Sequence, residues 1–126
     1  VEIQLVEWAQ WLENVYNNAQ YESTVIGHSG KLDPQDFLNR FTTTYEKNYF
    51  KYSNEEYDAK IAEAASVTDE TKRAEIYKEC QQKLADDAAS VFIQDPSINY
   101  AVRNTITGMQ IYPVTFFDMG SLRMAE

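Results

Sequence analysis

The chain has 126 residues, of which 44% are hydrophobic and 25% charged, a balance typical of one soluble globular domain. Its formal net charge of −9 argues against a nucleic-acid partner, because phosphates demand a basic face. No apolar run approaches the ~18 residues of a membrane span, so we expect no direct membrane insertion of this segment. Because the chain opens with Val1 inside a strand-like alternation, we expect it to be a piece of a longer protein.

The first 26 residues predict a strand, a helix and a second strand. Val1, Ile3 and Leu5 alternate with polar residues, which is the period of a strand with one covered face. From Trp8 to Ala19 the apolar residues instead follow one face of a helix. Residues 22–26 form the next apolar-ending run. We therefore expect a parallel βαβ unit, and an α/β fold class.

A polar, glycine-broken loop follows the second predicted strand. Residues 27–34 hold the only histidine of the chain, His28, together with Ser29, Lys31 and Asp33, and Pro34 suits the first turn of a new helix. Loops at the carboxyl ends of strands are where α/β folds usually bind ligands. Local chemistry alone favours an ordinary strand-to-helix connection with exposed polar residues.

The middle of the chain predicts three helices. Residues 35–41 form a short one, and residues 42–52 are an aromatic connection whose rings must cover the core edge or a cleft. Ser53 and Glu56 form a capping box for the second helix, and Thr68 is the expected cap of the third. The two later helices predict an αα-hairpin with these buried faces: Tyr57, Ile61 and Ala64; then Ile76, Tyr77, Cys80, Leu84 and Ala88.

The last third of the chain is less regular. Residues 90–94 predict a short buried strand, and residues 98–103 a second extended segment. After Thr105 the sequence has aromatic residues without a clear period. We expect this tail to pack on another part of the protein.

The residues do not favour catalysis or metal binding. Ser29 beside His28 is the only local nucleophile–base pair, and adjacent loop residues seldom point usefully at each other. His28 and Asp33 supply only two of the three or four ligands that zinc needs. Cys80 reads as a small buried apolar residue. We therefore expect no enzyme, no metal and no cofactor, and interpret the loop as part of a binding site.

Four sequence blocks, in this order, resemble one protein family. They are V-E-I-Q-L-V-E-W-A-Q-W-L, Y-E-S-T-V-I-G-H-S-G-K-L-D-P-Q-D-F-L, S-N-E-E-Y-D-A-K-I-A-E-A and T-D-E-T-K-R-A-E-I-Y-K-E-C-Q-Q-K-L-A-D-D-A. Together they are similar to the carboxy-terminal part of the extracellular solute-binding proteins (family 5) of the oligopeptide, dipeptide and nickel class. These proteins capture ligands for ABC importers.

The resemblance implies a partial second lobe of a two-lobed, type II periplasmic-binding-protein-like fold. Residues 1–103 would form this lobe without its first strand and helix, and residues 104–126 would be the terminal segment that packs on the first lobe. The partners implied are a peptide or similar small polar solute and an ABC transporter permease. The implied location is the extracellular face of the cell membrane or the periplasm, with a lipoprotein anchor in some members.

The loop departs from the family pattern at two positions. Peptide-binding members usually have a tryptophan where His28 stands, and an aspartate near Lys31 that pairs with the peptide's amino terminus. A lysine would repel an ammonium group, so the ligand is either a peptide held elsewhere or a solute with an anionic or hydroxyl-rich group facing Lys31. A partnerless, exposed Lys31 is the alternative. Asp33 either replaces the aspartate or only caps a helix.

Six residues are the predicted ligand contacts: His28, Ser29, Lys31 and Asp33 from the loop, with Tyr49 and Tyr52 as a cleft wall. Two other functions stay open at this point. One is a protein–protein interaction module that uses the tyrosine-rich surface, since nine tyrosines are many for this length. The other is a hydrolase with His28 as its base.

Overall fold

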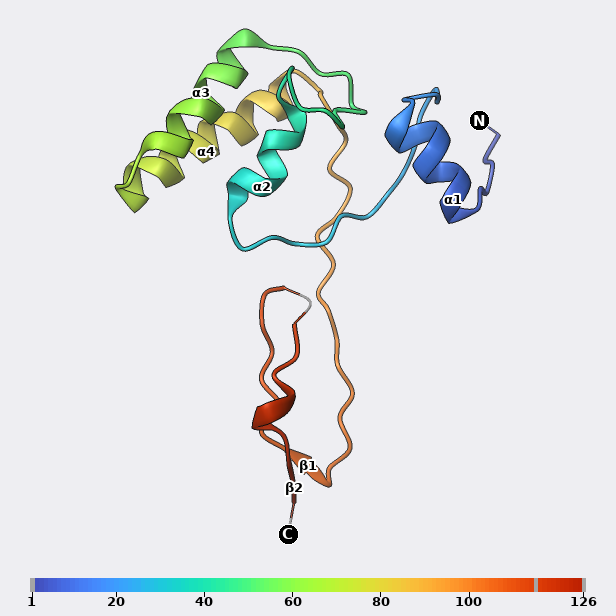
Figure 1. The fold of residues 1–126 in the computed structure, drawn as a ribbon, viewed down its shortest axis with the longest axis vertical. Coiled ribbons are helices and arrows are strands. Elements are labelled where there is room, and N and C mark those ends of the chain that lie inside the picture. Colours follow the sequence, from blue (N-terminus) through green and yellow to red (C-terminus); the bar gives the residue numbers. More distant parts are fainter. Residues whose placement is uncertain (1, 115, 126) are drawn as a thin grey trace. The chain divides into compact units, whose positions relative to one another are not determined.

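The computed structural model describes residues 2–114 and 116–125. It is a mixed helical structure with one small two-stranded sheet (Figure 1). The chain divides into two compact units, residues 1–27 with 33–91 and residues 28–32 with 92–126, and each is described here by itself. The elements are α1 (Trp8–Gln10), η1 (Trp11–Asn17), α2 (Pro34–Leu38), η2 (Asn39–Phe41), α3 (Glu55–Ser66), α4 (Glu70–Asp86), β1 (Ile106–Thr107), η3 (Met119–Ser121) and β2 (Arg123–Met124).

The predicted αα-hairpin is confirmed by α3 and α4, which run antiparallel and side by side (Figure 1). Their facing stripes bury Tyr57, Ile61 and Ala64 from α3, and Tyr77, Cys80 and Leu84 from α4. Ion pairs Lys60–Glu79 and Lys83–Glu56 join the rims of the hairpin. The buried face predicted for the third helix is too long, because α4 ends at Asp86 and leaves Ala88 exposed.

Both hairpin caps lie one residue later than the sequence predicts. Asn54, not Ser53, caps α3, and its side chain accepts hydrogen bonds from the backbone N–H groups of Glu56 and Tyr57. Asp69, not Thr68, caps α4 by accepting from the N–H of Lys72. A carboxylate or amide oxygen satisfies these unpaired donors as well as a hydroxyl does, so the adjacent residue took the role.

The short predicted helix is confirmed as α2 followed by the 3₁₀ turn η2. Pro34 occupies the first turn of α2, where its missing N–H costs nothing. Leu38 and Phe41 are buried against the hairpin, and the hydroxyl of Tyr57 donates to the carbonyl of Leu38 at 2.7 Å. This contact ties α2 to α3 in the main core.

The first predicted helix forms as α1 and η1, but η1 is a π-helix. Trp11 and Val15 of η1 are buried with Tyr49 in a second, largely aromatic cluster. The indole N–H of Trp11 donates to the Thr24 hydroxyl at 2.9 Å, and the Tyr21 hydroxyl donates to the carbonyl of Tyr49 at 2.6 Å. Through Tyr49, these contacts make the aromatic connection of residues 42–52 part of this second cluster.

The predicted βαβ unit is wrong. Residues 2–5, 22–26, 90–94 and 98–103 are not paired as strands, and Val1 lies outside the described residues. A strand needs a neighbour to satisfy its backbone N–H and C=O groups, and alternation along one segment cannot supply that neighbour. Across residues 2–114 and 116–125, the one pairing is the antiparallel ladder of β1 and β2, which the sequence did not predict.

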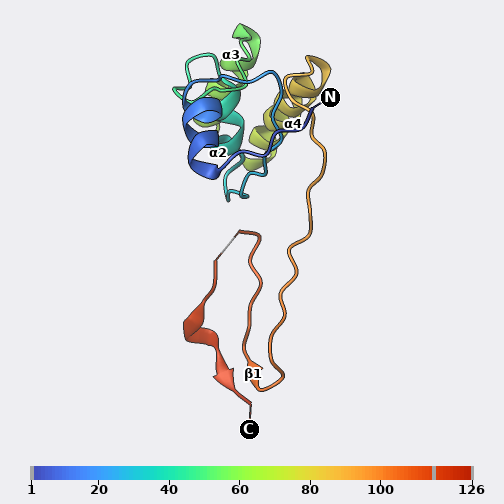
Figure 2. The same cartoon turned by 90° about the vertical axis from the view of Figure 1, so that its right-hand side faces the viewer.

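The second unit contains that ladder, and its strand β1 is labelled in Figure 2. Ile106 is opposite Met124, and Thr107 is opposite Arg123. Gly108 follows β1 with φ of +82°, and a Cβ there would lie 2.1 Å from the carbonyl oxygen of Ser121. Glycine is therefore required for this close approach.

Candidate ligand-binding site

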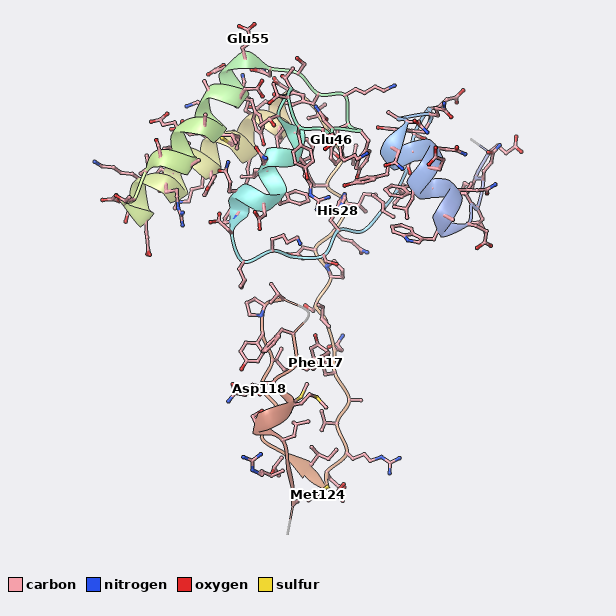
Figure 3. The ribbon with its side chains drawn as sticks, in the orientation of Figure 1. His28, Glu46, Glu55, Phe117, Asp118 and Met124 are labelled. Carbon is pink, nitrogen blue, oxygen red and sulfur yellow. The ribbon has the colours of Figure 1, made fainter. Side chains whose placement is uncertain are left out.

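The predicted binding loop is irregular from Gly27 to the start of α2. His28 is half-buried and is labelled in the segment that leads to α2 (Figure 3), whereas Ser29 and Lys31 are exposed. Within the second unit the loop passes close to residue 113, since a Cβ built on Gly30 would lie 3.5 Å from the carbonyl oxygen of Pro113. Exposed hydroxyl and ammonium groups in this loop suit a polar ligand.

Asp33 acts as the cap of α2. One carboxylate oxygen accepts from the backbone N–H of Gln35 at 2.9 Å, and the other lies 3.7 Å from the guanidinium of Arg73. The interpretation of Asp33 as a helix cap is thus confirmed. Both partners already occupy the carboxylate, which weakens the idea that Asp33 replaces the family's amino-terminus anchor.

Tyr49 is buried, whereas the sequence predicts it in the wall of a cleft. Its side chain is only 2% exposed, and its ring packs against Trp11, Tyr16, Tyr21 and Phe50. Burial raises the pKa of the Tyr49 phenol to about 12, which agrees with a ring sealed in the core. A wall formed by the open face of Tyr49 does not fit this burial.

Tyr52 is partly exposed and holds a different network. Its hydroxyl donates to a carboxylate oxygen of Asp87 at 2.6 Å, and the side-chain amide of Asn54 donates to the same oxygen at 2.9 Å. Burial and the hydrogen bond to Asp87 raise the pKa of Tyr52, while the hydrogen bond from Tyr52 lowers the pKa of Asp87. This network joins the start of α3 to the end of α4, so Tyr52 has a structural task.

A shallow pocket of about 290 Å³ lies beside α2 and α4, at a place the sequence did not single out. Next to it the Tyr77 hydroxyl donates to the side-chain oxygen of Gln35 at 3.0 Å. The ion pair of Arg73 with Asp33 links this pocket to one of the predicted site residues. Its lining residues are Pro34, Glu70, Arg73, Ala74, Tyr77, Lys78 and Gln81.

The six predicted contacts fall into both compact units. His28, Ser29 and Lys31 belong to the second unit, and Asp33 with the two tyrosines to the first. Their role as ligand contacts stays a prediction. Within the part of the chain that the structure describes, His, Cys, Asp and Glu residues do not gather in groups that could hold a metal ion.

Cys80 is fully buried in the hairpin, as the sequence predicts. Burial raises the pKa of its thiol, which disfavours the reactive thiolate. Among the described residues, none of the helices combines the length and the apolar character needed to cross a bilayer.

Curated proteins similar to this chain are binding proteins. The chain is 27% identical over 116 residues to the oligopeptide-binding protein AppA of Bacillus subtilis, covering 90% of the chain and 21% of that protein. It is 25% identical over 116 residues to the dipeptide-binding protein of Escherichia coli, covering 86% and 21%. A glutathione-binding protein of Pectobacterium atrosepticum is 29% identical over 75 residues, covering 60% and 15%.

No protein-family model matches the chain. The chain spans about a fifth of the length of the curated relatives named above. Their names describe binding proteins and not enzymes. These similarities extend over 60–90% of the chain.

Proposed function

We propose that this chain is the carboxy-terminal part of a solute-binding protein of the oligopeptide, dipeptide and nickel class, which captures a peptide or a similar small polar solute for an ABC importer. The observation that carries the proposal is the similarity over 85–90% of the chain to several peptide-binding proteins. Non-covalent capture between two lobes would be followed by delivery to a membrane permease. The protein would work in the periplasm or at the extracellular face of the membrane.

The exposed apolar side chains support a place within a larger fold. Isolated exposed apolar residues are common, but this chain has a series of large ones. We infer that further protein covers them. The terminal segment 104–126 would pack against a first lobe. The exposed apolar side chains include Ile3, Leu5, Trp8, Val91, Phe92, Ile93, Ile98, Ile111, Phe116, Phe117 and Met119.

The loop supports a ligand with a group that a lysine attracts. Lys31 is exposed, and among the described residues no carboxylate forms an ion pair with it. We propose that His28, Ser29 and Lys31 contact the solute, and that Lys31 faces an anionic or hydroxyl-rich group. A peptide ammonium at that point would be repelled.

The test uses the full-length protein that contains this chain. Melting temperatures are measured with di- and oligopeptides, glutathione, sugars and a nickel chelate, since a bound ligand stabilises the folded state. We expect a peptide-like solute to raise the melting temperature. Lys31→Asp is expected to change the preference between solutes with anionic and cationic groups about tenfold, as one nearby charge of opposite sign can do.

Lys72→Met is the matched control, because Lys72 is an exposed lysine on α4 that also forms no ion pair among the described residues. It should leave ligand preference unchanged. Equal binding by the wild type, Lys31→Asp and His28→Ala would show that the loop is not the site. No stabilisation by any of these solutes would contradict the proposed function.

A further inference from the structure

Arg40 has a fixed position in the first unit. It is the middle residue of η2, and the chain neighbours Leu38 and Phe41 are 4% and 0% exposed. Thr42 closes the turn, with its N–H and its hydroxyl both donating to the carbonyl of Asn39, at 3.1 and 2.8 Å. The core therefore holds the backbone at Arg40, so the base of its side chain has a fixed position.

The guanidinium of half-buried Arg40 has one donor that stays unpaired among the described residues. Its Nε is buried, and among the described residues it has no hydrogen-bond acceptor. Buried polar groups are nearly always hydrogen-bonded, and a charged donor is the most costly to leave unpaired. The chain has 20 acidic and 11 basic residues, and four other cations pair with carboxylates: Lys60, Arg73, Lys78 and Lys83.

The obvious local partner is not used. Asp36 precedes Arg40 by four residues, the spacing at which opposite charges pair on an α-helix. No ion pair forms between them in the described structure. The α-helix changes to a 3₁₀ turn at Asn39, and this tighter turn moves Arg40 out of line with Asp36.

Arg40 also lies near the aromatic cluster. Its positive charge acts on Tyr49 and lowers the pKa of the phenol, against the larger effect of burial. The ring of Tyr49 is packed with those of Trp11 and Tyr16. Charge interactions are stronger beside such an apolar cluster than in water, so this guanidinium would hold an anion firmly.

We propose that Arg40 binds a carboxylate that comes from outside the described residues. A guanidinium presents its donors in a planar fork that matches the two oxygens of a carboxylate. The carboxyl terminus of a bound peptide is one source, and an acidic side chain of the remaining polypeptide is the other. The first source rests on the proposed function; the second does not.

The experiment uses the full-length protein with Arg40→Lys, Arg40→Met and the control Lys72→Met. Each is titrated by calorimetry with a peptide that stabilises the wild type, in its free-carboxyl and its carboxy-terminally amidated form. If the ligand is the source, amidation weakens binding to the wild type and to Lys72→Met by about tenfold or more. Arg40→Met then loses this discrimination, and Arg40→Lys keeps part of it.

The melting temperature without ligand distinguishes the two sources. A carboxylate of the protein itself would be left unpaired in Arg40→Met, so the melting temperature would fall below that of the control while the peptide discrimination persists. An Arg40 without any carboxylate would behave oppositely, because removing an unpaired buried charge stabilises the fold. Intact discrimination with an unchanged or raised melting temperature therefore overturns the proposal.

Two further results are informative. If Asp36→Asn reproduces the effects of Arg40→Met, the partner is inside this chain and the proposal is overturned. If no peptide stabilises the wild type, the proposed function fails, and the ligand-free comparison of Arg40→Met with Lys72→Met still decides whether a protein carboxylate binds Arg40.

Discussion

The helical hairpin and the carboxy-terminal segment of this chain obtain their structure in different ways. In the hairpin, Tyr57 and Leu84 are 0% and 1% exposed, and caps, ion pairs and a buried hydroxyl support the packing. In residues 92–125 the ladder is two residues long on each side, and Ile98 and Phe117 are 59% and 43% exposed. A two-stranded ladder alone is marginal in water, whereas a helix pair with a buried face is stabilised by that face.

This difference shows what each region requires of its surroundings. The hairpin satisfies its apolar and polar groups mainly with its own residues and with α2. The carboxy-terminal segment leaves large apolar side chains uncovered within the described residues. Matched substitutions in the two regions test that distinction.

The largest expected effect is in the core of the hairpin. Leu84→Ala removes a fully buried side chain, and should lower the free energy of unfolding of the hairpin by about 3 kcal/mol. Amide hydrogen exchange in α3 and α4 measures it. Ile98→Ala is the counterpart in the other region and should change hairpin exchange by less than about 0.5 kcal/mol. Equal effects would mean that the two regions share one core.

A smaller effect is expected from one hydroxyl group. Tyr57→Phe leaves the buried carbonyl of Leu38 without its donor and should cost the hairpin about 1.5 kcal/mol. The matched change is Tyr112→Phe, since the Tyr112 hydroxyl donates to the exposed side chain of Gln110 at 2.8 Å. There water replaces the lost partner, and we expect less than about 0.5 kcal/mol. Urea unfolding followed by far-UV circular dichroism compares the stability of the two variants. A larger loss of stability for Tyr112→Phe than for Tyr57→Phe would contradict the distinction between the two regions.

The smallest of the three effects concerns caps. Asn54→Ala removes the acceptor for two N–H groups of α3 and should destabilise the hairpin by about 1 kcal/mol. Asp118 caps η3 in the same way by accepting from the N–H of Gly120, at 3.0 Å (Figure 3). Asp118→Ala should leave the thermal melting of the helices unchanged. A shift as large as that of Asn54→Ala would show that η3 contributes to hairpin stability.

Sequence patterns predicted the helical part of the fold well. The stripe of Tyr57, Ile61 and Ala64 and that of Tyr77, Cys80 and Leu84 follow helical spacing, so local periodicity was enough to find both faces. The caps were displaced because Ser53 and Asn54, like Thr68 and Asp69, are adjacent residues that can each cap a helix. Only the geometry of the first turn decides between them.

The strands and the site were beyond local patterns. Residues 2–5 alternate like a strand and residues 22–26 end in an apolar run, but strand pairing depends on segments distant in sequence. In the sequence, the ring of Tyr49 suits a ligand-binding wall and a hydrophobic core equally well. Its burial in the structure distinguishes the two roles. Asp33 was recognised as a possible cap because Pro34 follows it, whereas the isolation of Arg40 depends on the change from α2 to η2.

The burial of Cys80 has a practical consequence for labelling the protein with a fluorescent dye. The Cys80 thiol is 0% exposed, and burial raises its pKa, which disfavours the reactive thiolate. Alkylating dyes should therefore not react with it. Within this chain a cysteine placed at exposed Ser29 would then be the preferred site for a maleimide dye. An environment-sensitive label there would test whether a solute reaches the loop, because the native thiol would stay unlabelled.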